Sequence, residues 1–143
     1  MNEPLKFTFN VDGDDFTSAG EASVAVKKKL RWLGFPPDII KRVSIAMYEG
    51  EINMVIHAGG GVATLLVYPD KVQIELEDKG PGIENIELAM REGFSTAPDN
   101  IRNLGFGAGM GLPNMKRYTD TMEITSKIGE GTKIVMTVCH KDQ

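Results

Sequence analysis

Residues that build disulfide frameworks and metal clusters are scarce in this chain. Its 143 residues include one cysteine, Cys139, and two histidines. A single cysteine excludes an internal disulfide and a cysteine-rich zinc site, and two histidines leave little room for a histidine-rich metal site. We interpret Cys139 and the only tryptophan, Trp32, as core residues, and His140 as an exposed residue near the end of the chain.

Long apolar runs and an excess of positive charge are also missing. No apolar segment approaches the roughly 18 to 20 residues of a membrane helix, and the first residues, MNEPLKFTF, lack the pattern of a signal peptide. The net charge is −4 and the isoelectric point is near 5.2, which argues against a nucleic-acid partner. We therefore expect a soluble, cytoplasmic protein that binds neither nucleic acid nor membranes.

What the chain does have is ordinary globular composition and an excess of glycine. A length of 143 residues with 41% hydrophobic and 25% charged residues indicates a single domain, residues 1–143. The 16 glycines exceed the usual share of about 7%. Nine of them lie between Gly80 and Gly131, so this part of the chain requires backbone without side chains.

Hydrophobic periodicity predicts an alternation of strands and helices. The predicted strands span residues 5–11, 62–68, 72–78, 122–126 and 132–138. The predicted helices span residues 16–33, 36–57, 86–91 and 112–119. Hairpins with separate helices indicate an α+β fold, a two-layer sandwich in which helices cover one face of a mostly antiparallel sheet. The remaining stretch, about 93–111, is long enough to indicate a loop that is either functional or disordered.

The helix at 36–57 is apolar almost all round, but it carries two polar sectors. We interpret the first as the solvent-exposed face; it holds Lys41, Ser44 and Glu51. Apolar residues flank the second on both sides; it holds Arg42, Glu49 and Asn53, with His57 at its edge.

Glu49 and Asn53 are four residues apart and therefore stand one above the other on this helix. In one reading they form a functional pair, in which Asn53 offers an oxygen to Mg²⁺ and Glu49 acts as a base. In the other, Glu49 forms an ion pair with Arg42. The helix alone favours the ion pair, because ion-pair networks also place charges in such stripes.

Asp78 has the strand parity of Val72, Ile74 and Leu76, so its side chain points to the buried face of the sheet. An inward carboxylate at a strand end can accept a hydrogen bond from a ligand amine, and Gly82 would let that ligand lie against the main chain. A plain Asp-x-Gly turn is the alternative, and the inward parity argues against it.

Two further motifs contain closely spaced glycines. The segment 105–113, GFGAGMGLP, precedes a predicted helix and matches an anion site for phosphate, or else a flexible loop. It fits neither the dinucleotide fingerprint nor the P-loop spacing. In the segment GEGT, Thr132 has inward parity, although an ordinary hairpin turn would also explain this motif.

In this order, the four motifs resemble the GHKL ATPase superfamily of gyrase, chaperone, histidine-kinase and MutL domains. The helix motif from Glu49 to Asn53 matches the N-box, residues 78–82 the first glycine box, residues 107–111 the second, and 131–132 the closing Gly-Thr. The chain is most similar to the small anti-sigma-factor serine/threonine kinases and the stress-response switch kinases (RsbW- and RsbT-like). Residues 97–104 depart from the pattern as an insertion in the lid.

The resemblance implies the Bergerat ATP-binding fold, with a lid at about 93–111 and with ATP and Mg²⁺ as cofactors. It implies that Asp78 holds the adenine amino group with help from Thr132, that Asn53 ligates Mg²⁺, and that Glu49 is the catalytic base. The complete set of ATP-binding residues that it implies is Asn53, Asp78, Gly80, Gly82, Gly107, Gly109, Gly111, Leu112 and Thr132.

The implied function is a regulatory serine/threonine kinase that transfers the ATP γ-phosphate to a small regulatory protein, an antagonist of the anti-sigma type. The alternative is a non-catalytic, ATP-dependent module that sequesters a sigma factor or another regulator. The catalytic half of a sensor histidine kinase and a gyrase-like or chaperone-like motor fit less well, because neither a histidine-bearing helical hairpin nor a transducer domain is expected here. The first strand suits either a homodimer edge or an intramolecular role.

Overall fold

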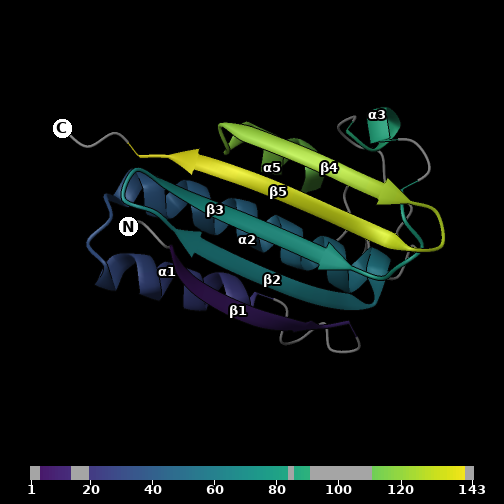
Figure 1. Cartoon of the computed structure of the whole chain (residues 1–143), viewed down its shortest axis with the longest axis horizontal. Coiled ribbons are helices and arrows are strands. Elements are labelled where there is room, and N and C mark those ends of the chain that lie inside the picture. Colours follow the sequence, from purple (N-terminus) through teal and green to yellow (C-terminus); the bar gives the residue numbers. More distant parts are fainter. Residues whose placement is uncertain (1–3, 14–19, 84–85, 91–110, 141–143) are drawn as a thin grey trace.

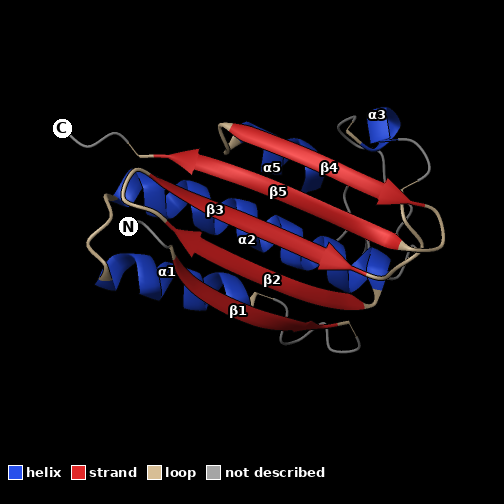
Figure 2. Ribbon diagram, in the orientation of Figure 1, coloured by secondary structure: helices blue, strands red, loops and turns tan. Residues whose placement is uncertain are grey.

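One antiparallel sheet with helices on one of its faces forms the fold (Figure 1; Figure 2). The computed structural model describes residues 4–13, 20–83, 86–90 and 111–140. The elements are β1 (Leu5–Asp12), α1 (Glu21–Trp32), α2 (Pro37–Ala58), β2 (Gly60–Val67), β3 (Lys71–Asp78), α3 (Ile86–Ala89), α5 (Gly111–Arg117), β4 (Thr121–Lys127) and β5 (Gly131–Cys139). The predicted α+β sandwich is confirmed. In the segments described, no helix is long and apolar enough to span a membrane.

The five strands follow the spatial order β1-β2-β3-β5-β4, and every neighbouring pair is antiparallel. Figure 1 shows α1, α2 and α5 behind the sheet, with α2 running along its middle. At one end of the sheet, Asp78, Thr132 and Ser126 lie directly opposite one another on β3, β5 and β4. Paired residues share a sheet face, so these three side chains form a row on the helix-covered side.

The hydrophobic core fills the space between the sheet and α2. Fully buried side chains come from both layers: Val43, Met47, Leu65, Ile74 and Met136 are representative. Burial of each such side chain stabilises the fold by roughly 1.5 to 3 kcal/mol relative to exposure. The period-2 pattern of the strands therefore predicts which face carries the helices.

Helix α2 lies close to β3 and to α5 because Gly50 has no side chain at the point of contact. A Cβ at Gly50 would overlap the side chain of Leu76 and would lie 3.4 Å from the Cε of Met115. Both neighbours are almost completely buried. The glycine thus fixes how near Glu49, the preceding residue, comes to α5.

The predicted solvent-exposed position of Glu51 on α2 is wrong. Its side chain is only 3% exposed, and its two carboxylate oxygens accept hydrogen bonds from the backbone N–H groups of Ala22 (3.0 Å) and Ser23 (3.1 Å). These donors belong to the first turn of α1, where helical N–H groups have no partner within the helix. The N-cap residue of α1, Gly20, offers no side-chain cap. Glu51 therefore caps α1 from a neighbouring helix, and its charge also suits the helix dipole.

Three other predicted environments also differ in the structure. Trp32 is 84% exposed, because it ends α1 on the side away from the buried stripe of that helix. Cys139 is exposed because it alternates with the buried Val138 on β5. His140 is half-buried, and its ring centroid lies 5.4 Å from that of Phe35. The backbone N–H of His140 donates to the carbonyl of Asp70 in the β2–β3 turn, which holds the residue against the sheet.

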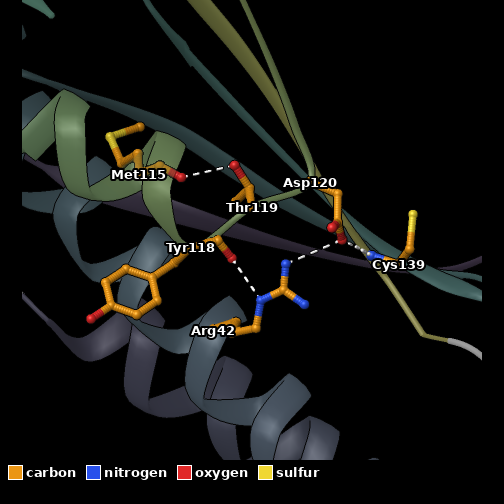
Figure 3. A network of polar contacts seen from close by, with 6 residues as sticks. All are labelled: Arg42, Met115, Tyr118, Thr119, Asp120 and Cys139. Carbon is orange, nitrogen blue, oxygen red and sulfur yellow. Dashed lines mark hydrogen bonds and ion pairs between the residues drawn. The ribbon is translucent and has the colours of Figure 1, made fainter.

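A polar network fastens α2 to the turn between α5 and β4 (Figure 3). Arg42 donates from Nε to the carbonyl of Tyr118 (3.1 Å) and forms an ion pair with Asp120 (3.2 Å). The same Asp120 oxygen accepts a hydrogen bond from the N–H of Cys139 (2.6 Å). The Arg42–Glu49 ion pair considered from the sequence is therefore replaced by an ion pair to Asp120.

The cap formed by Glu51 predicts a large effect for a small substitution. Glu51→Gln leaves one carbonyl oxygen for two backbone donors and aims an amide N–H at the other, so we expect the free energy of unfolding to fall by about 2 kcal/mol. Urea unfolding of the purified protein measures this change. Glu123→Gln, at an exposed position on β4, is the charge-matched control, and equal losses in the two variants would contradict the capping role.

Stability should depend on pH through Asp120. The hydrogen bond from Cys139 and the charge of Arg42 hold the pKa of this carboxyl below its ordinary value of 3.8. A lowered pKa in the folded state stabilises the protein above the unfolded pKa, and this contribution disappears as the pH falls through the folded pKa. Because Asp120 is partly exposed, we expect Asp120→Asn to lower Tm by only about 2 to 4 °C at pH 7.

The difference in Tm between wild type and Asp120→Asn should shrink when thermal melts are repeated below pH 3.8. Glu123→Gln again serves as control. A difference in Tm that stays constant from pH 7 to pH 3 would show that the carboxylate charge is not the stabilising feature.

Candidate functional site

Glu49 and Asn53 lie half-buried on successive turns of α2, and the start of α5 is seated against both. The carboxylate of Glu49 accepts a hydrogen bond from the side-chain amide of Asn114 at 3.0 Å. A Cβ at Gly111 would lie 3.3 Å from Oδ1 of Asn53. Gly111, the last residue of the second glycine box, thus lies against Asn53 of the N-box.

Helix α5 is anchored by Leu112, which is only 6% exposed and belongs to the hydrophobic core. The predicted ATP-binding residue Leu112 therefore packs inward in this structure. Lys116 and Arg117 are exposed, as expected for a solvated helix face. Arg117 also donates a hydrogen bond to Oδ1 of Asn114 (3.3 Å), so Asn114 connects a surface cation with the carboxylate of Glu49.

Asp78 ends β3 with its side chain on the helix side of the sheet, as its parity predicts. Its Oδ1 accepts two hydrogen bonds, from the N–H of Gly80 (2.9 Å) and from the N–H of Thr132 (3.2 Å). Its Oδ2 accepts no hydrogen bond from the residues that the structure describes. The Asp-x-Gly turn is therefore present, but it uses only one of the two carboxylate oxygens.

Thr132 is 9% exposed, and its hydroxyl lies 2.9 Å from the hydroxyl of Ser126. Ser126 also accepts a hydrogen bond from the N–H of Ile83 (2.6 Å), and the N–H of Gly129 donates to the carbonyl of Pro81 (2.9 Å). The loop after Asp78 is thus fastened to the β4–β5 hairpin.

The glycines of the first box have a packing role within the protein. A Cβ at Gly80 would lie 2.7 Å from the Cα of Ala58 at the end of α2, and one at Gly82 would lie 2.6 Å from the carbonyl oxygen of Lys127. Gly82 also has a φ of +84°, which favours glycine. The close approach expected for a ligand at Gly82 is made here by the β4–β5 hairpin.

The last turn of α2 is the place where the site residues of the sheet meet this helix. A Cβ at Gly61 would lie 2.9 Å from the sulfur of Met54 and 3.2 Å from the Cβ of Asp78. His57 is half-buried there, and burial holds its pKa below the ordinary value of 6.5, which leaves the ring neutral at pH 7. The end of α2 therefore adds no imidazolium charge to the site.

Most of the predicted site residues are gathered along the second half of α2. Glu49, Asn53 and Gly111 lie at the contact with α5, and Asp78, Gly80 and Thr132 lie at the end of the sheet. Gly107, Gly109 and most of the predicted lid are outside the described residues. Asn114 and Ser126 are not among the residues predicted from the sequence. Ser126 could have been found by its strand parity with Met122 and Ile124, whereas nothing in the sequence pairs Asn114 with Glu49.

Comparison with known proteins matches residues 34–142 to the family described as histidine kinase-, DNA gyrase B- and HSP90-like ATPase. The anti-sigma F factor of Clostridium acetobutylicum is 34% identical over 137 residues, which cover 92% of this chain and 89% of that protein. The serine/threonine-protein kinase RsbT of Bacillus subtilis is 34% identical over 124 residues, which cover 84% of this chain and 85% of that kinase.

A solved structure of the RsbU and RsbW domains of a Mycobacterium tuberculosis protein has the same fold. The TM-score is 0.65 at 15% identity, and the match covers 96% of this chain but only 33% of the other. Together with the family match over residues 34–142 and the relatives at 34% identity, the motifs lead to one conclusion: this chain belongs to the histidine kinase-, DNA gyrase B- and HSP90-like (GHKL) ATPase family.

Proposed function

We propose that this protein is an ATP-dependent serine/threonine kinase that phosphorylates a small regulatory protein. The observation that carries the proposal is the arrangement along the second half of α2, with Asp78 near its last turn and the Glu49–Asn53 pair against α5. The names of the relatives, an anti-sigma F factor and a serine/threonine-protein kinase, support a regulatory protein as the acceptor.

In this proposal Asp78 and Thr132 receive the adenine. Oδ2 of Asp78, which bonds to none of the described residues, accepts a hydrogen bond from the adenine amino group while Oδ1 stays fixed by two backbone donors. A hydrogen bond that involves a charged group is among the stronger ones. Gly80 and Gly82 shape the adjoining loop, and Gly107, Gly109 and Gly111 are proposed from the family resemblance to contact the phosphates.

The residues around Asn53 fit a magnesium ion that accompanies the nucleotide. The side-chain oxygen of Asn53 faces the backbone of Gly111, which has no side chain there. Mg²⁺ in such sites takes few protein oxygens, because phosphates and water supply the remaining ligands. When bound, the ion would neutralise phosphate charge. Asn53 would hold it, and Leu112 would keep the start of α5 anchored beside it.

Glu49 is proposed as the general base. The hydroxyl oxygen of the acceptor serine or threonine forms a bond to the γ-phosphorus, the bond from that phosphorus to the β–γ bridging oxygen breaks, and the hydroxyl proton passes to Glu49. Asn114 orients the carboxylate through one oxygen, Oε2. The protein contributes mainly by positioning and by charge.

A second candidate is a module that holds ATP and a partner without phosphate transfer. The hydrogen bond from Asn114 occupies Oε2 of Glu49, which is also compatible with a structural role for that carboxylate. The partner in this case would be a sigma factor or another regulator, in keeping with the anti-sigma relatives. Both candidates place the protein in the cytoplasm, and a homodimer is compatible with either.

Nucleotide binding provides the first test. Asp78→Asn retains one oxygen for the two backbone donors and presents an amide N–H to the adenine amino group, so we expect the affinity for ADP to fall about 10- to 100-fold. Isothermal calorimetry measures it. Glu77→Gln removes one charge from the exposed neighbouring residue and should bind ADP like wild type. An unchanged affinity in Asp78→Asn would refute the proposed adenine site.

Phosphate transfer separates the two candidates. Glu49→Gln can still bond to Asn114 but cannot accept a proton, so we expect transfer of radiolabelled γ-phosphate to a co-purified regulatory protein to fall by about 100-fold or more. ADP binding should stay within about threefold of wild type, because Glu49 acts on the acceptor hydroxyl. Glu123→Gln is the control. ATP-dependent association without transfer, in wild type as in Glu49→Gln, would support the non-catalytic module.

A further inference from the structure

We propose that Ser126 is a positioning residue that fixes the direction of the Thr132 hydroxyl and thereby strengthens the preference of the site for adenine. The inference rests on the proposed function, in which Asp78 and Thr132 receive the base. Ser126 itself lies one strand farther away, on β4, opposite Thr132 in the β4–β5 pairing. It would therefore act through Thr132.

The contacts of Ser126 restrict where its single hydrogen can go. A serine hydroxyl has one hydrogen to donate and two lone pairs that can accept. The N–H of Ile83 donates to one lone pair at 2.6 Å. Two acceptors compete for the hydrogen: the Thr132 hydroxyl at 2.9 Å and the carbonyl of Gly131 at 3.3 Å.

The 2.9 Å contact between the two hydroxyls fits donation in either direction, and we take Ser126 as the donor because its other acceptor, the carbonyl of Gly131, is farther away. O–H···O hydrogen bonds lie at about 2.5 to 3.0 Å, so the contact with Thr132 falls within this range and the contact with Gly131 falls outside it. When Thr132 accepts from Ser126, its own hydrogen remains for a ligand. Thr132 then presents a donor beside Asp78, whose Oδ2 presents an acceptor.

An acceptor beside a donor distinguishes two closely related bases. The edge of adenine offers an amino donor next to a ring-nitrogen acceptor, which matches the pair formed by Asp78 and Thr132. Hypoxanthine offers the reverse, a carbonyl acceptor next to a ring N–H donor, which opposes this pair. Without Ser126, the Thr132 hydroxyl can rotate and present a lone pair instead, so part of the discrimination should be lost.

The surroundings of Ser126 fix its side chain in place. It belongs to the row formed with Asp78 and Thr132 across three paired strands. The N–H of Ile83 holds its oxygen from the side of the loop, and the bond from Gly129 to Pro81 holds that loop against the hairpin. The hydroxyl is thus a built part of the site and not a mobile surface group.

The experiment compares ADP with inosine diphosphate by calorimetry in wild type and in four variants: Ser126→Ala, Ser126→Thr, Thr132→Val and the double variant Ser126→Ala/Thr132→Val. We expect Ser126→Ala to weaken ADP binding about tenfold and inosine diphosphate binding less than about threefold, as for loss of one oriented hydrogen bond. Ser126→Thr, which keeps a hydroxyl, should restore the preference. The double variant should bind ADP no more weakly than Thr132→Val, because Ser126 acts through Thr132.

A purely structural role for Ser126 would give a different result. Equal weakening of both nucleotides, or losses that add in the double variant, would overturn the inference, and so would unchanged ADP binding in Ser126→Ala. If that variant does not fold, Ser126→Cys provides the same comparison, because a thiol has similar size but is a weak donor. Absence of nucleotide binding by wild type would instead overturn the proposed function and the inference with it.

Discussion

The approach of α2 to the sheet is the constraint on which the rest of this structure depends. Gly50 permits it, because any side chain there would overlap Leu76 and crowd Met115. The helix consequently contacts the sheet, α1 and α5, while Lys41 and Tyr48 remain exposed. Burial of a polar side chain is costly unless it finds a partner, and among the described residues of α2 the buried hydroxyl of Ser44 is an exception without one.

Three charged side chains of α2 find their partners in three different ways. Glu51 caps α1, Arg42 bonds to the turn after α5, and Glu49 accepts the amide of Asn114. At the end of the sheet, Oδ1 of Asp78 accepts two backbone hydrogen bonds, while Oδ2 accepts none from the described part of the chain. The site is therefore made of groups whose protein partners fix their orientation without using all their hydrogen-bonding capacity.

The features predicted correctly from the sequence are those that depend on the residue periodicity within a single helix or strand. Strand alternation placed Asp78 and Thr132 on the correct face, and the helix wheel separated Glu49 and Asn53 as a distinct stripe. The wheel misplaced Glu51, because it gives an angle and says nothing about a second helix packed there. The partner of Asn114 was likewise beyond reach, because Glu49 lies on another helix 65 residues earlier in the sequence.

The cap on α1 also affects where the chain can be truncated without loss of stability. The family match begins at residue 34, after both β1 and α1. A fragment that began there would leave the carboxylate of Glu51 inside the protein without its two backbone donors and would expose the paired edge of β2. An unpaired buried charge and a bare strand edge are sources of misfolding and aggregation. The start of the family match is therefore not a suitable place to truncate the chain, and the similarity to the anti-sigma F factor of Clostridium acetobutylicum, which covers 92% of this chain, extends beyond it.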